Sequence, residues 1–406
     1  MTRHYLKLIW NRRRTNLLIM VEIFFSFLVV FGVVAMAAYF VNHYRQPLGF
    51  SIEDVWAVDV ATPYRPSPGR TTTIGDLATT QRQLHLAVQE FPEVVALAGA
   101  FTVPYGHAQW INDVTVAGRT IAYGVNVVTD GFAQVFGLDI VQGRWFGTED
   151  DATAWTPVVI NERLARAFFG AKNPVGQVVP QDKPGEGETQ KEMRVIGVVS
   201  EFRQDGELAE PANYMFERRR PDDASVAEPM HRLAIKVRPG TTAAFEERLV
   251  KRMEAVAKDW SFQVQPIDDM RAADLRDALA PLLGGTIIAG FLMLMVAMGL
   301  TGVLWQTVTQ RTKEIGLRRA KGATIPNIRT QILGELVAMT TLAVLLGTAI
   351  AIQFPLLKLF GYVSGGVYAV SLVISALCIY LLTVACAWYP SRMATRIQPA
   401  EALHYE

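Results

Sequence analysis

The chain has 406 residues, half of them apolar, with 39 basic and 38 acidic side chains. Its mean hydropathy of +0.20 is high for a chain in which 19% of the residues are charged. The near-neutral net charge gives no support for nucleic acid as a partner. The only cysteines, Cys378 and Cys386, lie in the last apolar run and have no disulfide or metal-ligand spacing. Because the apolar residues are clustered, the composition indicates a membrane protein.

Four apolar runs are long enough to cross a bilayer, whose hydrocarbon core of about 30 Å needs roughly 20 helical residues. They cover residues 17–40, 282–308, 332–354 and 368–389. The first run contains Glu22 and ends near residues 35–37, Ala-Met-Ala, which are similar to a signal-peptidase site. The run is longer than the apolar region of a signal peptide, which favours an uncleaved anchor over a cleaved signal.

Basic residues flank the runs on alternating sides, and such residues concentrate in cytoplasmic loops. The N-terminal segment contains Arg3, Lys7, Arg12, Arg13 and Arg14, and the second loop contains Arg311, Lys313, Arg318, Arg319, Lys321 and Arg329. The loop before the last run has only Lys358, and the tail has Arg392 and Arg396. The pattern predicts that both termini are cytoplasmic and that residues 41–281 lie outside.

Residues 41–281 are numerous enough to bury a core and show a mixed α/β pattern. Two stretches each indicate strand, helix and strand, at 55–60, 74–90 and 94–99, and again at 233–237, 242–258 and 262–266. Such units pair into a split, ferredoxin-like layer. A hairpin at Ala117-Gly118 and strands near 125–128, 158–160 and 193–199 predict a second, inserted subdomain. Asn161 can cap a short helix ending at Gly170, and residues 180–190 are expected to form a loop.

The sequence therefore predicts an α-helical membrane domain plus a mixed α/β extracytoplasmic domain. The expected segments are a cytoplasmic N-terminal helix (1–16), transmembrane helices (17–40, 282–308, 332–354, 368–389), the outer domain (41–281), a cytoplasmic loop (309–331), a short outer loop (355–367) and a cytoplasmic tail (390–406).

No catalytic constellation is visible in the sequence. There is no glycine loop ending in Gly-Lys-Ser/Thr, no His-Glu-x-x-His and no Gly-x-Ser-x-Gly. The histidines occur singly, which indicates surface positions or core positions with satisfied hydrogen bonds; they are His4, His43, His85, His107, His231 and His404. ATP-driven work by this chain would require a nucleotide-binding partner.

The cytoplasmic loop at residues 311–323 is the most informative stretch. Glu314 and Arg318 are four residues apart, in the order that favours a helical ion pair. Gly322 can end that helix, and Thr324 with Pro326 can start the next. A short helix tied to two spans can transmit force from a docked protein. The same residues also suit a basic connector that only sets the orientation.

This loop resembles that of one family, the MacB and FtsX type of ABC transporter permease, also called type VII or mechanotransmission transporters. The family pattern is Arg-Thr-x-Glu-Ile-Gly-x-Arg-x-Ala-x-Gly-Ala, matched by Arg311, Thr312, Glu314, Ile315, Gly316, Arg318, Ala320, Gly322 and Ala323. Glu335 lies where the family has a glutamate early in its third span. Residues 11–16 and 389–406 are similar to the family's two ends, and 157–169, 173–176 and 195–199 are similar to its periplasmic core domain.

The resemblance implies a MacB-type periplasmic core domain with two subdomains, and a place in a bacterial inner membrane. It implies a homo- or heterodimer of permeases bound to two copies of a separate ABC ATPase, which would hold ATP and Mg. The loop helix would sit in a groove of that ATPase, so this chain would be no enzyme and bind no cofactor. Some members carry the ATPase in front on the same chain. This chain starts shortly before its first span, so we expect a separate ATPase.

The leading functional hypothesis is a permease that couples ATP hydrolysis to motion of its outer domain, for efflux of a drug, peptide or similar compound. Lipoprotein release and regulation of cell-wall hydrolases are alternatives within the family, and a periplasmic adaptor is left open. A membrane-anchored sensor is the alternative from another class; it would need no ATPase. An envelope enzyme is disfavoured because no acid, base, nucleophile or metal set can be assembled.

Overall fold

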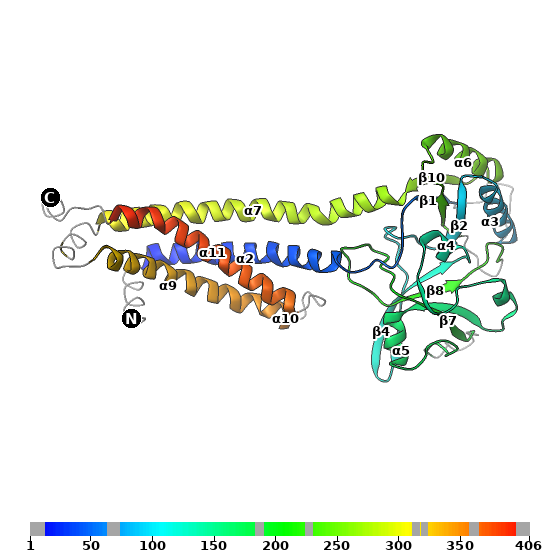
Figure 1. Cartoon of the computed structure of the whole chain (residues 1–406), viewed down its shortest axis with the longest axis horizontal. Helices are drawn as coiled ribbons and strands as arrows, with labels where there is room; N and C mark the ends of the chain where they lie inside the picture. The colour runs from blue at the N-terminus through cyan, green and yellow to red at the C-terminus, as the bar shows by residue number, and fades with distance from the viewer. Residues whose placement is uncertain are drawn as a thin grey trace. The chain divides into compact units, whose positions relative to one another are not determined.

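In a computed structural model, the described residues are 13–62, 74–182, 191–223, 230–310, 317, 324–356 and 365–394. Figure 1 traces them along the chain. The chain divides into two compact units. The helical unit comprises Met1–Asn42 and Ala278–Glu406, and the α/β unit comprises His43–Asp277.

Among the described residues, four helices are long and apolar enough to cross a membrane, as the sequence predicts. They belong to α2 (Arg13–Tyr44), α7 (Ile267–Gln310), α9 (Ile325–Ala351) and α11 (Gly365–Ala394), and the short α10 (Gln353–Leu356) follows α9. With 44 residues, α7 is about 66 Å long, at about 1.5 Å per residue. A bilayer core needs less than half of that length. Residues 267–281, for which the sequence predicted no element, are thus the first turns of this helix.

The helical unit packs around an apolar cluster that includes Ile23, Phe27, Leu300, Met339 and Ile379. Small residues let the helices approach closely. A Cβ on Gly347 of α9 would lie 2.4 Å from the ring of Phe27 on α2. A Cβ on Gly285 of α7 would lie 3.0 Å from Val33 of α2. Gly285 and Gly347 are therefore two points of close helix contact.

Hydroxyl groups join α9 to α11. Thr340 Oγ1 and Thr383 Oγ1 are 3.2 Å apart, and Thr341 Oγ1 is 2.8 Å from the Tyr380 hydroxyl. Inside an apolar bundle, such bonds satisfy polar atoms that lipid could not. Large apolar side chains elsewhere on the same helices are exposed, among them Ile287, Phe291, Met298, Val373 and Leu381. Such a surface is suited to hydrocarbon rather than water.

The α/β unit is built on one ten-stranded sheet, with strand order β10-β1-β9-β2-β4-β8-β6-β7-β5 and β3 paired to β4. The first four strands are β10 (Ser261–Pro266), β1 (Val55–Ala61), β9 (Arg232–Val237) and β2 (Val94–Ala100), all antiparallel. Helices α3 (Ile74–Gln89) and α6 (Ala243–Val256) lie together on one face of them (Figure 1). This order confirms the predicted ferredoxin-like layer.

The second subdomain is inserted between β2 and β9. Its strands are β3 (Ile111–Val116), β4 (Arg119–Val128), β5 (Ile140–Gly143), β6 (Thr156–Asn161), β7 (Met193–Val199) and β8 (Tyr214–Arg218). The helical elements are α4 (Phe132–Phe136), the 3-10 helix η1 (Thr148–Ala152) and α5 (Glu162–Phe169). The sheet passes from one half to the other at β2 and β4, through the pair Ala100 and Val128.

Local signals in the sequence form as expected. Ala117 and Gly118 both have positive φ, 49° and 78°, the geometry of a tight hairpin turn between β3 and β4. Asn161 Oδ1 accepts a hydrogen bond from Leu164 N at 3.0 Å and caps α5, which ends before Gly170. The same oxygen accepts from Tyr214 N at 3.0 Å, so the cap also ties α5 to β8. Residues 183–190 of the expected 180–190 loop lie outside the described residues.

Candidate functional site

The proposed ATPase-coupling residues lie outside the described residues. They are Arg311, Glu314, Ile315, Gly316, Arg318, Gly322 and Ala323. Among residues 311–323 only Leu317 is described, and it is half exposed. Beyond the loop, α9 begins at Ile325 with Thr324 as its N-cap and Pro326 in its first turn, as the sequence suggested.

The two acidic residues of the predicted spans are both half-buried within the helical unit. Glu22 on α2 faces Gly299 on α7: a Cβ on Gly299 would lie 2.9 Å from the Glu22 carboxylate. Glu335 lies on α9, in the third turn from its start. The absence of a side chain at Gly299 thus leaves room for a carboxylate between two spans. A role for Glu22 or Glu335 in coupling stays a prediction.

Within the α/β unit, the end of α2 and the start of α7 meet the same short segment, residues 200–209, here called the junction segment. It follows β7 and precedes β8. The backbone N–H of Arg203 donates to Leu48 O at 3.1 Å, just beyond the end of α2. Tyr105 N in turn donates to Gln204 O at 2.9 Å. The junction segment is therefore hydrogen-bonded to two other parts of the chain, one just after α2 and one at Tyr105.

Arg203 is the central side chain of the junction segment and is 2% exposed. Its Nη1 donates to His43 O at 2.9 Å and to Gln46 O at 3.1 Å. Its Nη2 donates to Glu207 O at 2.7 Å and Ala209 O at 2.5 Å. The last carbonyls of a helix lack intrahelical donors and carry partial negative charge, so a guanidinium there satisfies them and stabilises the helix end. Arg203 thereby fixes the end of α2 to the junction segment.

Glu207 makes the corresponding connection to α7. Its carboxylate accepts from the Tyr105 hydroxyl at 2.7 Å and from Arg271 Nε at 2.7 Å. The Glu207 side chain is 4% exposed. Burial alone would raise the pKa of Glu207, but the hydrogen bonds from Tyr105, from backbone N–H and from Arg271 outweigh it and lower the pKa. The carboxylate therefore stays charged, and its pairing with Arg271 holds the first turns of α7.

Apolar packing strengthens the same attachment. Ile267, the first residue of α7, is fully buried in the core of the α/β unit, and Met270 packs against that core. Phe50, which follows the end of α2, packs on three aromatic rings. Its ring centroid lies 6.2 Å from that of Tyr105, 6.3 Å from that of Phe136 and 5.4 Å from that of Phe202. Both helices therefore connect to the core by buried side chains as well as by polar bonds.

Two glycines allow the junction segment to lie in close contact with its neighbours. Gly49 has φ 82°, and a Cβ there would lie 1.9 Å from Glu201 O. Gly206 has φ 81°, and a Cβ there would lie 2.4 Å from the ring of Tyr105. The positive φ and the tight space both favour glycine. Tyr105 itself has φ 62°, an uncommon backbone conformation for a tyrosine, and burial followed by its bond to Glu207 raises its pKa, which keeps the phenol a donor.

The junction segment joins the ends of two helices. The described residues contain no group of three His, Cys, Asp or Glu side chains placed to hold a metal ion. Arg203, Glu207 and Arg271 were not predicted, because single charged residues carry no periodic signal. The one available hint was the run of charged residues around Gly206, directly after the apolar strand β7.

Comparisons with known proteins agree with this architecture. Residues 17–252 match the MacB-like periplasmic core domain, and residues 286–399 match the FtsX-like permease C-terminal domain. The chain belongs to the MacB/FtsX-type family of ABC transporter permeases. It is accordingly an inner-membrane permease with transmembrane helices and an extracytoplasmic α/β domain.

Three relatives illustrate the family. The chain is 30% identical to the macrolide export ATP-binding/permease protein MacB of Bdellovibrio bacteriovorus over 69% of its own length and 43% of that protein. It is 28% identical to the uncharacterized ABC transporter permease YknZ of Bacillus subtilis over 70% of both chains. It is 25% identical to the pyoverdine export ATP-binding/permease protein PvdT of Pseudomonas aeruginosa over 67% of its length and 41% of that protein. The chain thus spans less than half of the MacB and PvdT relatives.

Proposed function

We propose that this chain is the permease subunit of an ABC exporter, in which a separate ATPase subunit hydrolyses ATP and the resulting motion reaches the α/β domain through α2 and α7. The observation that carries the proposal is the junction segment, which bonds to the end of α2 through Arg203 and to the start of α7 through Glu207. Each helix also contains a span. A shift of either span is therefore delivered to one segment of the α/β domain.

The cytoplasmic input in this proposal is the loop at residues 309–331. With both termini in the cytoplasm, this loop lies on the side where ATP is available. Its short helix, with Glu314 and Arg318 four residues apart, would dock on the ATPase. Two ATPase copies and two permease chains, identical or related, complete the assembly. This chain itself then needs neither ATP nor Mg.

Export of a small organic molecule is the transport reaction that the relatives support. MacB is named for macrolide export and PvdT for pyoverdine export. Lipoprotein release and regulation of cell-wall hydrolases are the alternatives within the same family. An adaptor in the periplasm would extend the path beyond the membrane.

The test is purification of the tagged chain from native membranes in mild detergent, with measurement of ATP hydrolysis and of the masses that co-purify. We expect a subunit of nucleotide-binding-domain size, and hydrolysis that is coupled to the permease. Glu314→Lys is expected to abolish the coupled hydrolysis or the association. Lys313→Glu is the matched control, because it reverses a neighbouring charge at a position that the family pattern leaves free. A lone, inactive chain would instead support a membrane-anchored sensor.

A further inference from the structure

A polar groove lies between the two halves of the α/β domain. It consists of two adjoining cavities of about 450 and 370 Å³, which share His85, Gln89, Asp130, Arg220 and Pro221. One wall is formed by α3 and β2, and the other by residues 129–134, by η1 and by the chain from Arg218 at the end of β8 onward. Volumes of this size are typical of small-molecule sites.

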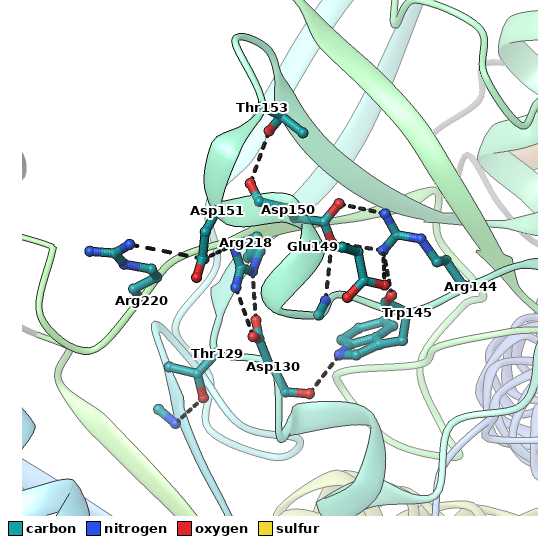
Figure 2. A network of polar contacts seen from close by, with 12 residues as sticks. Thr129, Asp130, Arg144, Trp145, Glu149, Asp150, Asp151, Thr153, Arg218 and Arg220 are labelled. Carbon is teal, nitrogen blue, oxygen red and sulfur yellow. Dashed lines mark hydrogen bonds and ion pairs between the residues drawn. The ribbon is translucent and has the colours of Figure 1, made fainter.

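Ion pairs fix one wall of the groove. Arg218, whose side chain is 7% exposed, donates to both carboxylate oxygens of Asp130 at 2.7 and 2.8 Å and to Asp151 at 2.7 Å. Figure 2 shows Arg218 between these two carboxylates. Behind Asp151, the fully buried side chain of Asp150 is bound by Arg144 at 2.6 and 2.7 Å. The wall is therefore organised before any ligand arrives, and its carboxylates are already occupied by guanidinium groups.

Donors remain on the groove after this pairing. Arg82 of α3 is exposed and makes no ion pair with any residue that the structure describes. Arg220 is 49% exposed; it contacts Asp222 at 3.1 Å and lies 4.0 Å from Asp151, which leaves several of its five N–H donors available. The groove thus presents an excess of donors to a bound acceptor.

Apolar surface adjoins these donors. Leu86 on α3 is 53% exposed and Val95 on β2 is 51% exposed, and each lines one of the two cavities. His85, which lines both cavities, is 8% exposed. Its Nδ1 has no hydrogen-bond partner among the described residues, which departs from the expectation that each buried histidine is satisfied. Such unpaired buried atoms are uncommon, and a polar ligand group or a bridging water could pair with it.

We propose that this groove binds an amphipathic organic anion, with its carboxylate, phosphate or sulfonate held by Arg82 and Arg220 and its apolar part against Leu86 and Val95. The proposal deepens the proposed function, because such a molecule would be cargo that contacts the α/β domain. Binding needs neither ATP nor the ATPase subunit. A negative binding result therefore leaves the co-purification test unaffected, and the reverse also holds.

The test titrates the full chain in lipid nanodiscs with two dyes that share one fluorophore: dansyl-glutamate, an anion, and dansyl-cadaverine, a cation. Binding is read as saturable fluorescence above that of empty nanodiscs. We expect dansyl-glutamate to bind at least tenfold more tightly than dansyl-cadaverine. The double variant Arg82→Glu/Arg220→Glu should weaken dansyl-glutamate binding at least tenfold. Arg119→Glu, an exposed charge reversal at the start of β4, is the matched control and should change it less than twofold.

A milder second variant keeps the test informative if the double variant fails to fold. Arg82→Gln replaces an exposed guanidinium that makes no ion pair among the described residues with a neutral amide, so the fold should persist and binding should weaken about fivefold. Three results would overturn the proposal: no saturable binding of dansyl-glutamate to the wild-type chain, equal binding of the two dyes, or unchanged binding in Arg82→Gln.

Discussion

The guanidinium of Arg203 donates to the carbonyl oxygen of His43 at 2.9 Å, across 160 residues of sequence. His43 lies in the last turn of α2, and Arg203 lies in the junction segment between β7 and β8. A single buried side chain therefore connects the end of a membrane-spanning helix to the inserted half of the α/β domain. Mutation of Arg203 therefore tests directly whether this attachment matters.

Replacing Arg203 by methionine should destabilise the α/β domain. The change keeps an apolar stem but removes the side-chain donor of the carbonyls of His43, Gln46, Glu207 and Ala209. Of these four, the His43 carbonyl keeps another hydrogen bond, from Gln46 N at 3.0 Å. With each lost partner costing about 1–3 kcal/mol, and with partial rescue by water, we expect a loss on the order of 3 kcal/mol. Arg163→Met is the control, since Arg163 is 46% exposed and forms a 3.7 Å pair with Glu201; it should cost less than about 1 kcal/mol.

Denaturant unfolding of the full chain, followed by tryptophan fluorescence, measures both variants. Hydrogen exchange then locates the effect. The amides of residues 43–48 should exchange faster in Arg203→Met than in the wild type, because the helix end is released. Equal losses in Arg203→Met and Arg163→Met would show that the four carbonyl bonds contribute little.

Glu207 should make the domain sensitive to acid. Its pKa is lowered from 4.5 in the folded state, so its contribution to stability is complete above pH 4.5 and is lost as the pH falls through the lower folded pKa. Glu207→Gln removes this ionisation. We expect the stability of the variant to be lower than that of the wild type at neutral pH, with the difference shrinking below about pH 4. Unfolding curves at pH 3.5 to 7 test this; a difference that is constant with pH would contradict it.

His85 should act in a separate pH window. Burial lowers the pKa of His85 from 6.5 to about 4, so the folded state excludes a proton that the unfolded chain binds. The stability contributed by the neutral ring is complete above pH 6.5 and is lost as the pH falls towards 4, with a total on the order of 3 kcal/mol. His85→Leu should flatten the wild-type slope between pH 4 and 6.5. An unchanged slope would indicate that His85 titrates normally.

The helical unit offers a matched pair of glycine substitutions. Gly347→Ala places a Cβ 2.4 Å from the Phe27 ring, whereas Gly302→Ala meets no atom of the described residues within 4 Å. Gly347→Ala should lower the melting temperature of the detergent-solubilised chain by several degrees, because α2 and α9 must separate. Gly302→Ala should be neutral or slightly stabilising, since alanine favours helix over glycine by about 1 kcal/mol. Partial recovery in Gly347→Ala/Phe27→Leu would identify the ring as the obstacle.

The sequence predicted those parts of the fold that periodic patterns specify. The four spans follow from apolar length alone. The two strand-helix-strand units follow from short apolar strands such as β1 and β9, in which Val58 and Ile235 are fully buried. The cap at Asn161 and the turn at Ala117-Gly118 follow from local chemistry. Strands β5 and β8 were not predicted, because four or five residues with mixed polarity carry a weak period.

The candidate sites were harder to predict for physical reasons. Arg203 and His43 come together only after the sheet forms, so no local pattern could join them. The groove residues Arg82, on α3, and Arg220, after β8, belong to different halves of the α/β domain and are also brought together by folding. The extension of α7 to Ile267 was missed because Asp268, Asp269, Arg271 and Asp274 make its first turns polar, which resembles a loop although acidic residues suit a helix N-terminus.

The most direct test of the central claim is hydrogen exchange of the junction segment in the purified complex of permease and ATPase, with and without ATP. We expect ATP to change the exchange of the amides of residues 200–209 in the wild type. The change should vanish in Glu314→Lys, where the cytoplasmic loop is uncoupled, and persist in Lys313→Glu. Identical exchange with and without ATP, in a wild-type complex that hydrolyses ATP, would contradict transmission of the ATPase motion through α2 and α7.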